Sequence, residues 1–206
     1  MAAVDLRPIP VTRRPARRLP QLFAGLALYG ASMAMQIRSG LGLNPWDVLH
    51  EGLTEQTPLS FGLITAITGA VVLLLWIPLR QRPGIGTVAN VVVIAVAVDV
   101  ALALLPAPDA LPVRIALLLG GVVLNGVATA AYVGARLGPG PRDGLMTGFA
   151  ARTGRSVRLV RTCIEVTVLA AGWLLGGTVG VGTVLYALAI GPLTQAFLPF
   201  FVVRER

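Results

Sequence analysis

Long apolar runs alternate with short polar breaks along almost the whole chain. Each run holds about 20 mostly apolar residues, the length that an α-helix needs to cross roughly 30 Å of hydrocarbon. A helix also satisfies its backbone amides and carbonyls within its own segment, as lipid requires. The pattern therefore predicts an all-α integral membrane protein with six transmembrane helices, at residues 19–37, 59–79, 85–105, 113–135, 157–175 and 181–201.

The breaks after the first and fourth runs resemble each other. One reads GLGLNPWDVLHEGL (40–53) and the other reads RLGPGPRDGLMTGF (136–149). Proline at a first helical position and aspartate at the third are typical of a helix start, and Asn44 is a suitable N-cap. We therefore expect a short motif helix to begin at Pro45 and another at Pro141. The pattern leaves open whether these helices lie at the membrane interface or enter the membrane.

The chain contains an internal repeat. A shift of 96 residues aligns 18–105 with 114–201 without a gap, and 24 of 88 positions are identical, whereas this composition would give roughly one in ten by chance. Each copy holds three spans, so the second copy enters the membrane from the opposite side. We therefore expect two inverted three-helix repeats, an architecture shared by many secondary transporters.

Arginine gives the expected orientation. All 17 basic residues are arginine, and 15 of them lie in the two tails, in alternate connections between spans or at the start of the fifth span. The other connections hold only Arg38 and Arg114. Because positive residues favour the cytoplasmic side, both termini are predicted to be cytoplasmic, including an Arg-rich tail at 1–17 and a short tail at 202–206.

Composition supports lipid as the main solvent. The chain is 55% hydrophobic with a mean hydropathy of +0.80, and 13% of its residues are charged, against roughly 25% in soluble domains. The net charge of +8 does not indicate nucleic-acid binding, because the arginines cluster between apolar runs. A single cysteine, Cys163, and a single histidine, His50, exclude a disulfide framework and make a metal site unexpected. No catalytic or nucleotide-binding motif indicates an enzyme or a cofactor.

Asp99 is the sole acidic residue in the first four predicted spans. An ionisable side chain within a span is costly and is by default a candidate functional residue. No arginine lies three or four positions away, so we expect Asp99 to face the bundle interior, either paired with Arg38 or Arg114 or neutral by protonation. Its counterpart in the second copy is Gln195.

Other polar residues extend the list of candidates. Glu165 follows Arg161 by four positions, which favours a simple neutralising pair. Asp47 and Asp143 have two compatible interpretations, as helix-start residues and as direct participants in solute or ion handling. The pathway candidates are Asp99, Asp47, Asp143, Asn44, Glu165, Gln195 and Asn90, and the structural motif positions are Pro45, Pro141, Gly52, Gly148, Gly84, Gly86, Gly180 and Gly182.

The first copy also carries a recognisable series of motifs. The sequence NPWD, followed by SFG at 60–62 and RPGIGTVAN at 82–90, resembles the YczE/YyaS/YitT family of bacterial multi-pass membrane proteins, and most of all its YczE-like members. The second copy departs from the motif, with Gly140 and Arg142 in place of Asn44 and Trp46. The resemblance implies a location in the bacterial inner membrane and supplies no catalytic residues.

These features favour a small-solute transporter or permease-like protein with a site between the two repeats. One alternative is a non-transporting accessory or regulatory protein that binds a membrane or cytoplasmic partner through the Arg-rich loop 136–158. Another is the substrate-binding subunit of a multi-component uptake system. The expected partners are the lipid bilayer, a small solute and such a protein, and not nucleic acid.

Overall fold

The computed structural model describes residue 6 and residues 8–203, which form α-helices and no strand. The all-helical prediction is therefore confirmed. Arg7, Arg204 and Arg206 of the predicted tails lie outside the described residues, and the first helix already includes the last residues of the expected N-terminal tail. The helices are α1 (Pro15–Ser39), α2 (Pro45–Glu55), α3 (Phe61–Leu79), α4 (Ile85–Leu104), α5 (Leu111–Gly134), α6 (Pro141–Thr153), α7 (Val157–Leu174) and α8 (Val181–Phe201).

The helix boundaries follow local signals in the sequence. Helices α2 and α6 begin at Pro45 and Pro141, as expected from proline at a first helical position. Each start from α1 to α4 recurs 96 residues later in α5 to α8. Helix boundaries and sequence identities thus share one offset.

Four helices in the described part of the chain are long and apolar enough to cross a membrane: α3, α4, α5 and α8. Helix α1 carries Arg18, Ser32 and Gln36, all fully buried, and packs against both α4 and α5. Protein therefore surrounds much of α1, which reduces its need for a lipid-like composition. Helix α7 carries three charged residues, Arg158, Arg161 and Glu165.

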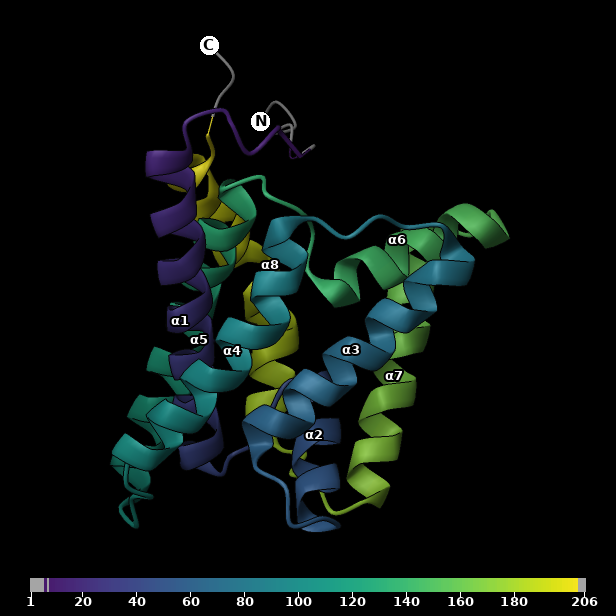
Figure 1. Ribbon diagram of the computed structural model, residues 1–206. Helices are drawn as coiled ribbons and strands as arrows, with labels where there is room; N and C mark the ends of the chain where they lie inside the picture. Colours follow the sequence, from purple (N-terminus) through teal and green to yellow (C-terminus); the bar gives the residue numbers. More distant parts are fainter. Residues whose placement is uncertain (1–5, 7, 204–206) are drawn as a thin grey trace.

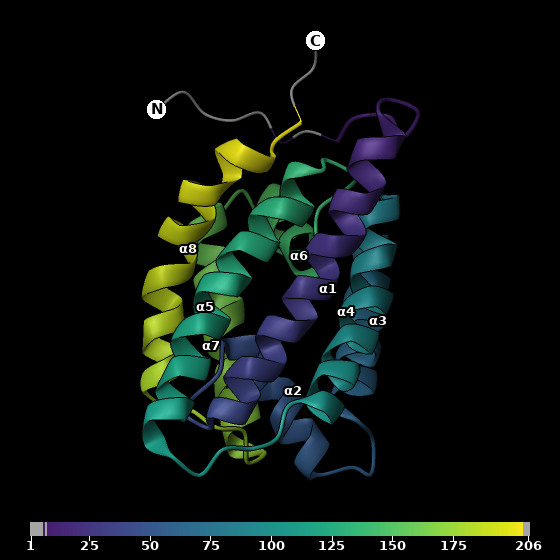
Figure 2. The same cartoon turned by 90° about the vertical axis from the view of Figure 1, so that its left-hand side faces the viewer.

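The helices form two groups. Helices α1, α4, α5 and α8 pack together, α2 lies on α7, and α3 lies between α4 and α6 and contacts both (Figure 1). Figure 2 shows α8, α5, α1 and α4 side by side in front of the second group. Glycine permits close approaches within the first group: a Cβ on Gly25 of α1 would lie 2.9 Å from the backbone nitrogen of Tyr132 in α5.

The repeated segments GIGTV (84–88) and GVGTV (180–184) form the starts of α4 and α8 and bind the opposite half of the chain. The Gly86 amide at the start of α4 donates to Leu137 O at 3.0 Å, and the Gly182 amide at the start of α8 donates to Leu41 O at 2.8 Å. Each bond joins one half of the chain to the connection before the motif helix of the other half. The flanking glycines, Gly84 and Gly180, also lie within van der Waals distance of these connections.

Candidate functional site

The start of α2 places a carboxylate inside the protein. Asn44 is the N-cap, as expected, and its side-chain oxygen accepts from the amides of Trp46 and Asp47, both at 3.1 Å. The Asn44 amide nitrogen also donates to Asp47 Oδ2 at 2.5 Å. Asp47 therefore does not cap the helix itself, and its second oxygen, Oδ1, is directed elsewhere.

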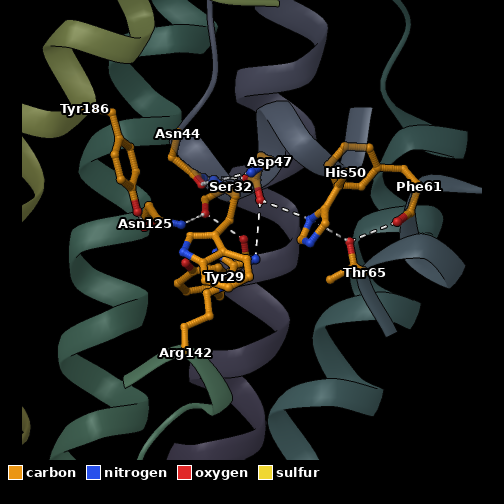
Figure 3. Close-up of polar contacts among 11 residues, drawn as sticks. Tyr29, Ser32, Asn44, Asp47, His50, Phe61, Thr65, Asn125, Arg142 and Tyr186 are labelled. Carbon is orange, nitrogen blue, oxygen red and sulfur yellow. Dashed lines mark hydrogen bonds and ion pairs between the residues drawn. The ribbon is translucent and has the colours of Figure 1, made fainter. Parts of the chain in front are cut away.

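Asp47 is 1% exposed, and its Oδ1 lies between two basic side chains. His50 Nδ1 is 3.5 Å away on the same helix, and Arg142 Nη2 is 3.6 Å away on α6 (Figure 3). Both separations exceed good hydrogen-bond distances, and Oδ1 has no hydrogen-bond partner among the described residues. A buried charge that is only partly compensated is costly, which makes this carboxylate a candidate binding group.

His50 links Asp47 to α3. Its Nδ1 lies 3.2 Å from the hydroxyl of Thr65, which donates to Phe61 O at 2.9 Å. Because that hydroxyl proton points to Phe61, Nδ1 is best assigned as the protonated nitrogen of a neutral ring. Nε2 is then an acceptor, and it too has no partner among the residues described.

The motif helices of the two halves meet at their starts. The Arg142 guanidinium lies over the Trp46 ring, with Cζ 4.9 Å from the ring centroid. These residues occupy equivalent positions in α6 and α2, directly after the proline. Trp76 of α3 positions α6, because its Nε1 donates to Pro141 O at 3.0 Å. Trp46 Nε1 is buried without a described partner and is an available donor.

A polar chain from the other helix group lies beside this cluster. The Tyr186 hydroxyl donates to Asn125 Oδ1 at 2.9 Å, and the Asn125 amide donates to Ser32 Oγ at 2.8 Å (Figure 3). Ser32 in turn donates to Tyr29 O at 2.6 Å. This chain joins α8, α5 and α1, so polar groups from both helix groups face the same region.

The corresponding carboxylate in the second half, Asp143, has different surroundings. It is exposed, whereas Asp47 is buried. Tyr132 and Asn90 lie nearby, since a Cβ on Gly140 would be 3.2 Å from Asp143 Oδ2, 3.3 Å from Tyr132 Oη and 3.8 Å from Asn90 Nδ2. Asn90 and Asp143 are thus brought together, as two of the sequence candidates.

The remaining candidates lie away from the Asp47 cluster. Asp99 accepts from Ser60 Oγ at 2.6 Å and from the Gly62 amide at 2.7 Å, so it binds the start of α3 and not Arg38 or Arg114. Those arginines donate to backbone carbonyls instead.

The last two candidates lie on α7 and α8. Glu165 accepts from Arg161 Nε at 2.9 Å, as its spacing predicted. Gln195 is exposed on α8.

Sequence reasoning missed His50 and Arg142 as members of the site. The signals were present, since His50 follows Asp47 by three positions on one helix and Arg142 is the repeat counterpart of Trp46. Sequence could not show that the two motif helices would meet. The described residues contain no group of three or more His, Cys, Asp or Glu side chains suited to a metal ion.

Comparison with known proteins places this chain in a family. Residues 16–199 match the family of unknown function DUF6198. An uncharacterized protein of Haemophilus influenzae is 42% identical over 177 residues, covering 86% of this chain and 81% of the relative. The uncharacterized membrane protein YczE of Bacillus subtilis is 37% identical over 180 residues, covering 86% and 83%. The uncharacterized protein YyaS of the same organism is 25% identical over 179 residues, covering 85% and 89%. No solved structure matches the chain.

Proposed function

The chain belongs to the DUF6198 family and is a relative of the membrane protein YczE, and from this premise we propose that it is a bacterial inner-membrane transporter of a small polar solute. The observation that carries the proposal is the buried Asp47 cluster at the meeting point of the two motif helices. A purely structural core would leave few polar atoms there unpaired.

The proposal includes two inverted repeats around a pseudo-two-fold axis in the membrane plane, with six crossings. Reciprocal hydrogen bonds support it. Arg18 Nε donates to Ala135 O at 2.8 Å, and its counterpart Arg114 donates through Nε to Ser39 O at 2.7 Å. Ser39 and Ala135 are themselves counterparts. Each half therefore binds the other through the same pair of positions, as an exact exchange of the halves requires.

The atoms that lack a hydrogen-bond partner among the described residues suggest the chemistry of the solute. Asp47 Oδ1 and His50 Nε2 are acceptors, while Trp46 Nε1 is a donor. An amino group on a small solute would match the two acceptors, and an acceptor atom on the solute would match the Trp46 donor. Transporter sites commonly lie near the bilayer midplane and are formed there by the starts of helices that begin inside the membrane and end at its surface.

Flux measurements on the purified protein alone in liposomes test this function. The probe set consists of radiolabelled amino acids and small amines, and at least one should enter faster than into empty liposomes. Asp47→Asn should reduce its uptake by roughly 10–100-fold while leaving folded protein, because a hydrogen bond to a charged group contributes about 1.5–3 kcal/mol. Arg155→Gln, a change at an exposed position outside the cluster, should leave uptake unchanged. Equal uptake by Asp47→Asn and unaltered protein would remove Asp47 from the site.

The orientation is tested separately. Reporters of membrane sidedness fused to either terminus should indicate a cytoplasmic location. The same reporters inserted at 106–112 should indicate an external location. These outcomes follow from the arginine distribution. Opposite sides for the two termini would contradict an even number of crossings and with it the inverted repeat.

One observation favours the accessory-protein alternative. Every residue from 151 to 159 is exposed, and this segment includes Arg152, Arg155 and Arg158. The segment could therefore bind an acidic partner protein. Flux by the purified protein alone would argue against both this alternative and an uptake subunit that needs a separate energising component.

A further inference from the structure

The two halves differ where their equivalent helices should pack. Helix α3 packs against α4. Their counterparts, α7 and α8, make no comparable contact in the part of the chain that the structure describes, and Figure 1 shows them well apart. The last two helices of the four-helix unit therefore pack together in the first half and lie apart in the second half.

Specific contacts hold α3 against α4. Asp99 on α4 accepts from Ser60 Oγ and from the Gly62 amide at the start of α3. Gly62 permits this approach, since a Cβ there would lie 2.1 Å from Ala95 O. Farther along, a Cβ on Gly69 would lie 3.6 Å from Val91 Cβ.

The equivalent positions on α7 and α8 lack these contacts. The counterpart of Asp99 is Gln195, which is exposed, and the counterpart of Ala95 is Gly191, around which a Cβ would meet nothing within 4 Å. Phe61 at the start of α3 is 5% exposed, whereas its counterpart Val157 on α7 is 48% exposed. The separation therefore extends over both facing surfaces.

The carboxylates of the two motif helices differ in exposure in the same sense as the α3–α4 and α7–α8 pairs differ in packing. Asp47, on the side of the α3 start, is 1% exposed, and Asp143, on the side of the α7 start, is exposed. The start of α3 and the end of α4 lie toward the outside in the proposed orientation. The start of α7 and the end of α8 lie toward the cytoplasm.

We infer that the protein is in an inward-facing conformation, and that α3–α4 and α7–α8 are its outer and inner gates, with Asp99 and Gln195 as the gate residues. This inference rests on the proposed transport function. In the outward-facing conformation, α7 closes on α8 through Gln195 while α3 parts from α4. Two halves of similar fold can exchange their arrangements in this way, and this exchange gives the site alternating access.

The unequal gate residues bias the equilibrium. The Asp99 carboxylate makes two charge-assisted hydrogen bonds, which are roughly twice as strong as neutral ones. At the Gln195 position, an amide would make only neutral bonds with the equivalent donors, the Ser156 hydroxyl and the Arg158 backbone amide. The outer gate is therefore the more stable contact, and the inward-facing conformation is the resting one.

Matched cysteine pairs test the gates without any solute. In a Cys163→Ala background, one variant carries Gly69→Cys with Val91→Cys across the outer gate. The other carries Glu165→Cys with Ala187→Cys, the positions 96 residues later across the inner gate. The Cβ separation at the first pair falls within the range that a disulfide requires. Copper phenanthroline oxidises each pair in membranes, and maleimide–polyethylene glycol then counts the remaining free thiols on a denaturing gel.

We expect rapid oxidation of the outer pair and slow oxidation of the inner pair. Adding Asp99→Asn should accelerate oxidation of the inner pair by roughly tenfold, because it weakens the outer gate. Ser60→Ala, which removes one of the two bonds, should shift the rates in the same direction and replaces Asp99→Asn if that variant does not fold. Equal rates for the two pairs, or rates that neither gate variant changes, would overturn the inference. Since no solute is present, this result is independent of the flux screen.

Discussion

Arg18→Gln is expected to leave little folded protein after mild heating. The Arg18 side chain is fully buried, and all of its guanidinium nitrogens donate to backbone carbonyls at 2.7–3.0 Å. Glutamine has two side-chain donor hydrogens against five in arginine, so several buried carbonyls would lose their partner. The cost should be on the order of 3 kcal/mol or more, since each unsatisfied buried group costs about 1–3 kcal/mol. The acceptors are Ile9, Pro10, Arg13, Ala135 and Arg136.

The repeat provides a matched control for this change. Arg114 donates to two carbonyls, those of Ser39 and Gly40, and its environment is more exposed. Arg114→Gln should therefore reduce stability by clearly less. The measurement is the fraction of detergent-purified protein that stays monodisperse on size-exclusion chromatography after a series of heating steps. If both variants survive heating equally, the Arg18 contacts contribute less than their geometry indicates.

Gly172→Ala is expected to separate α2 from α7. A Cβ on Gly172 would lie 2.4 Å from the backbone nitrogen of Leu49 and 2.5 Å from its Cα. Backbone atoms cannot rotate away as a side chain can, so α2 must move. Such overpacking typically costs about 1–3 kcal/mol, even though alanine is the better helix former in isolation. Because α2 carries Asp47, the same change should also impair solute uptake.

Gly191→Ala serves as the control for that substitution. A Cβ at Gly191 of α8 would meet nothing within 4 Å, so only the helix preference of alanine remains. Stability after Gly191→Ala should be unchanged or higher by about 0.5–1 kcal/mol. The same heating series compares the two alanine variants. A Gly172→Ala protein as stable as Gly191→Ala would show that α2 and α7 can separate at little cost.

Local chemistry explains which parts of the site the sequence could predict. Asn44 and Pro45 define a helix start through groups within a few positions of each other, and the structure confirms that start. The Arg161–Glu165 pair lies within one helical turn and is likewise confirmed. The family was also identifiable, because its motifs are contiguous stretches of sequence.

Other parts of the site depend on contacts between distant helices. The partner of Asp99 could not be found from charge alone, since a helix start with free donors competes with arginine for the carboxylate. Sequence also gave no reason to join His50 and Arg142 to Asp47, because the two basic residues are 92 positions apart and belong to different halves.

The sequence by itself determined the membrane character, the helical composition and the starts of α2 and α6, because apolar run length and helix-end chemistry act over a few residues to one span. The duplication was equally visible, since an offset of 96 preserves residue identities directly. Only the tertiary structure decided that Asp47 meets Arg142 and that α3 packs on α4 while α7 stands apart from α8. Two repeats of similar sequence can pack in more than one arrangement, and the choice between them depends on the sum of many weak contacts across the whole bundle.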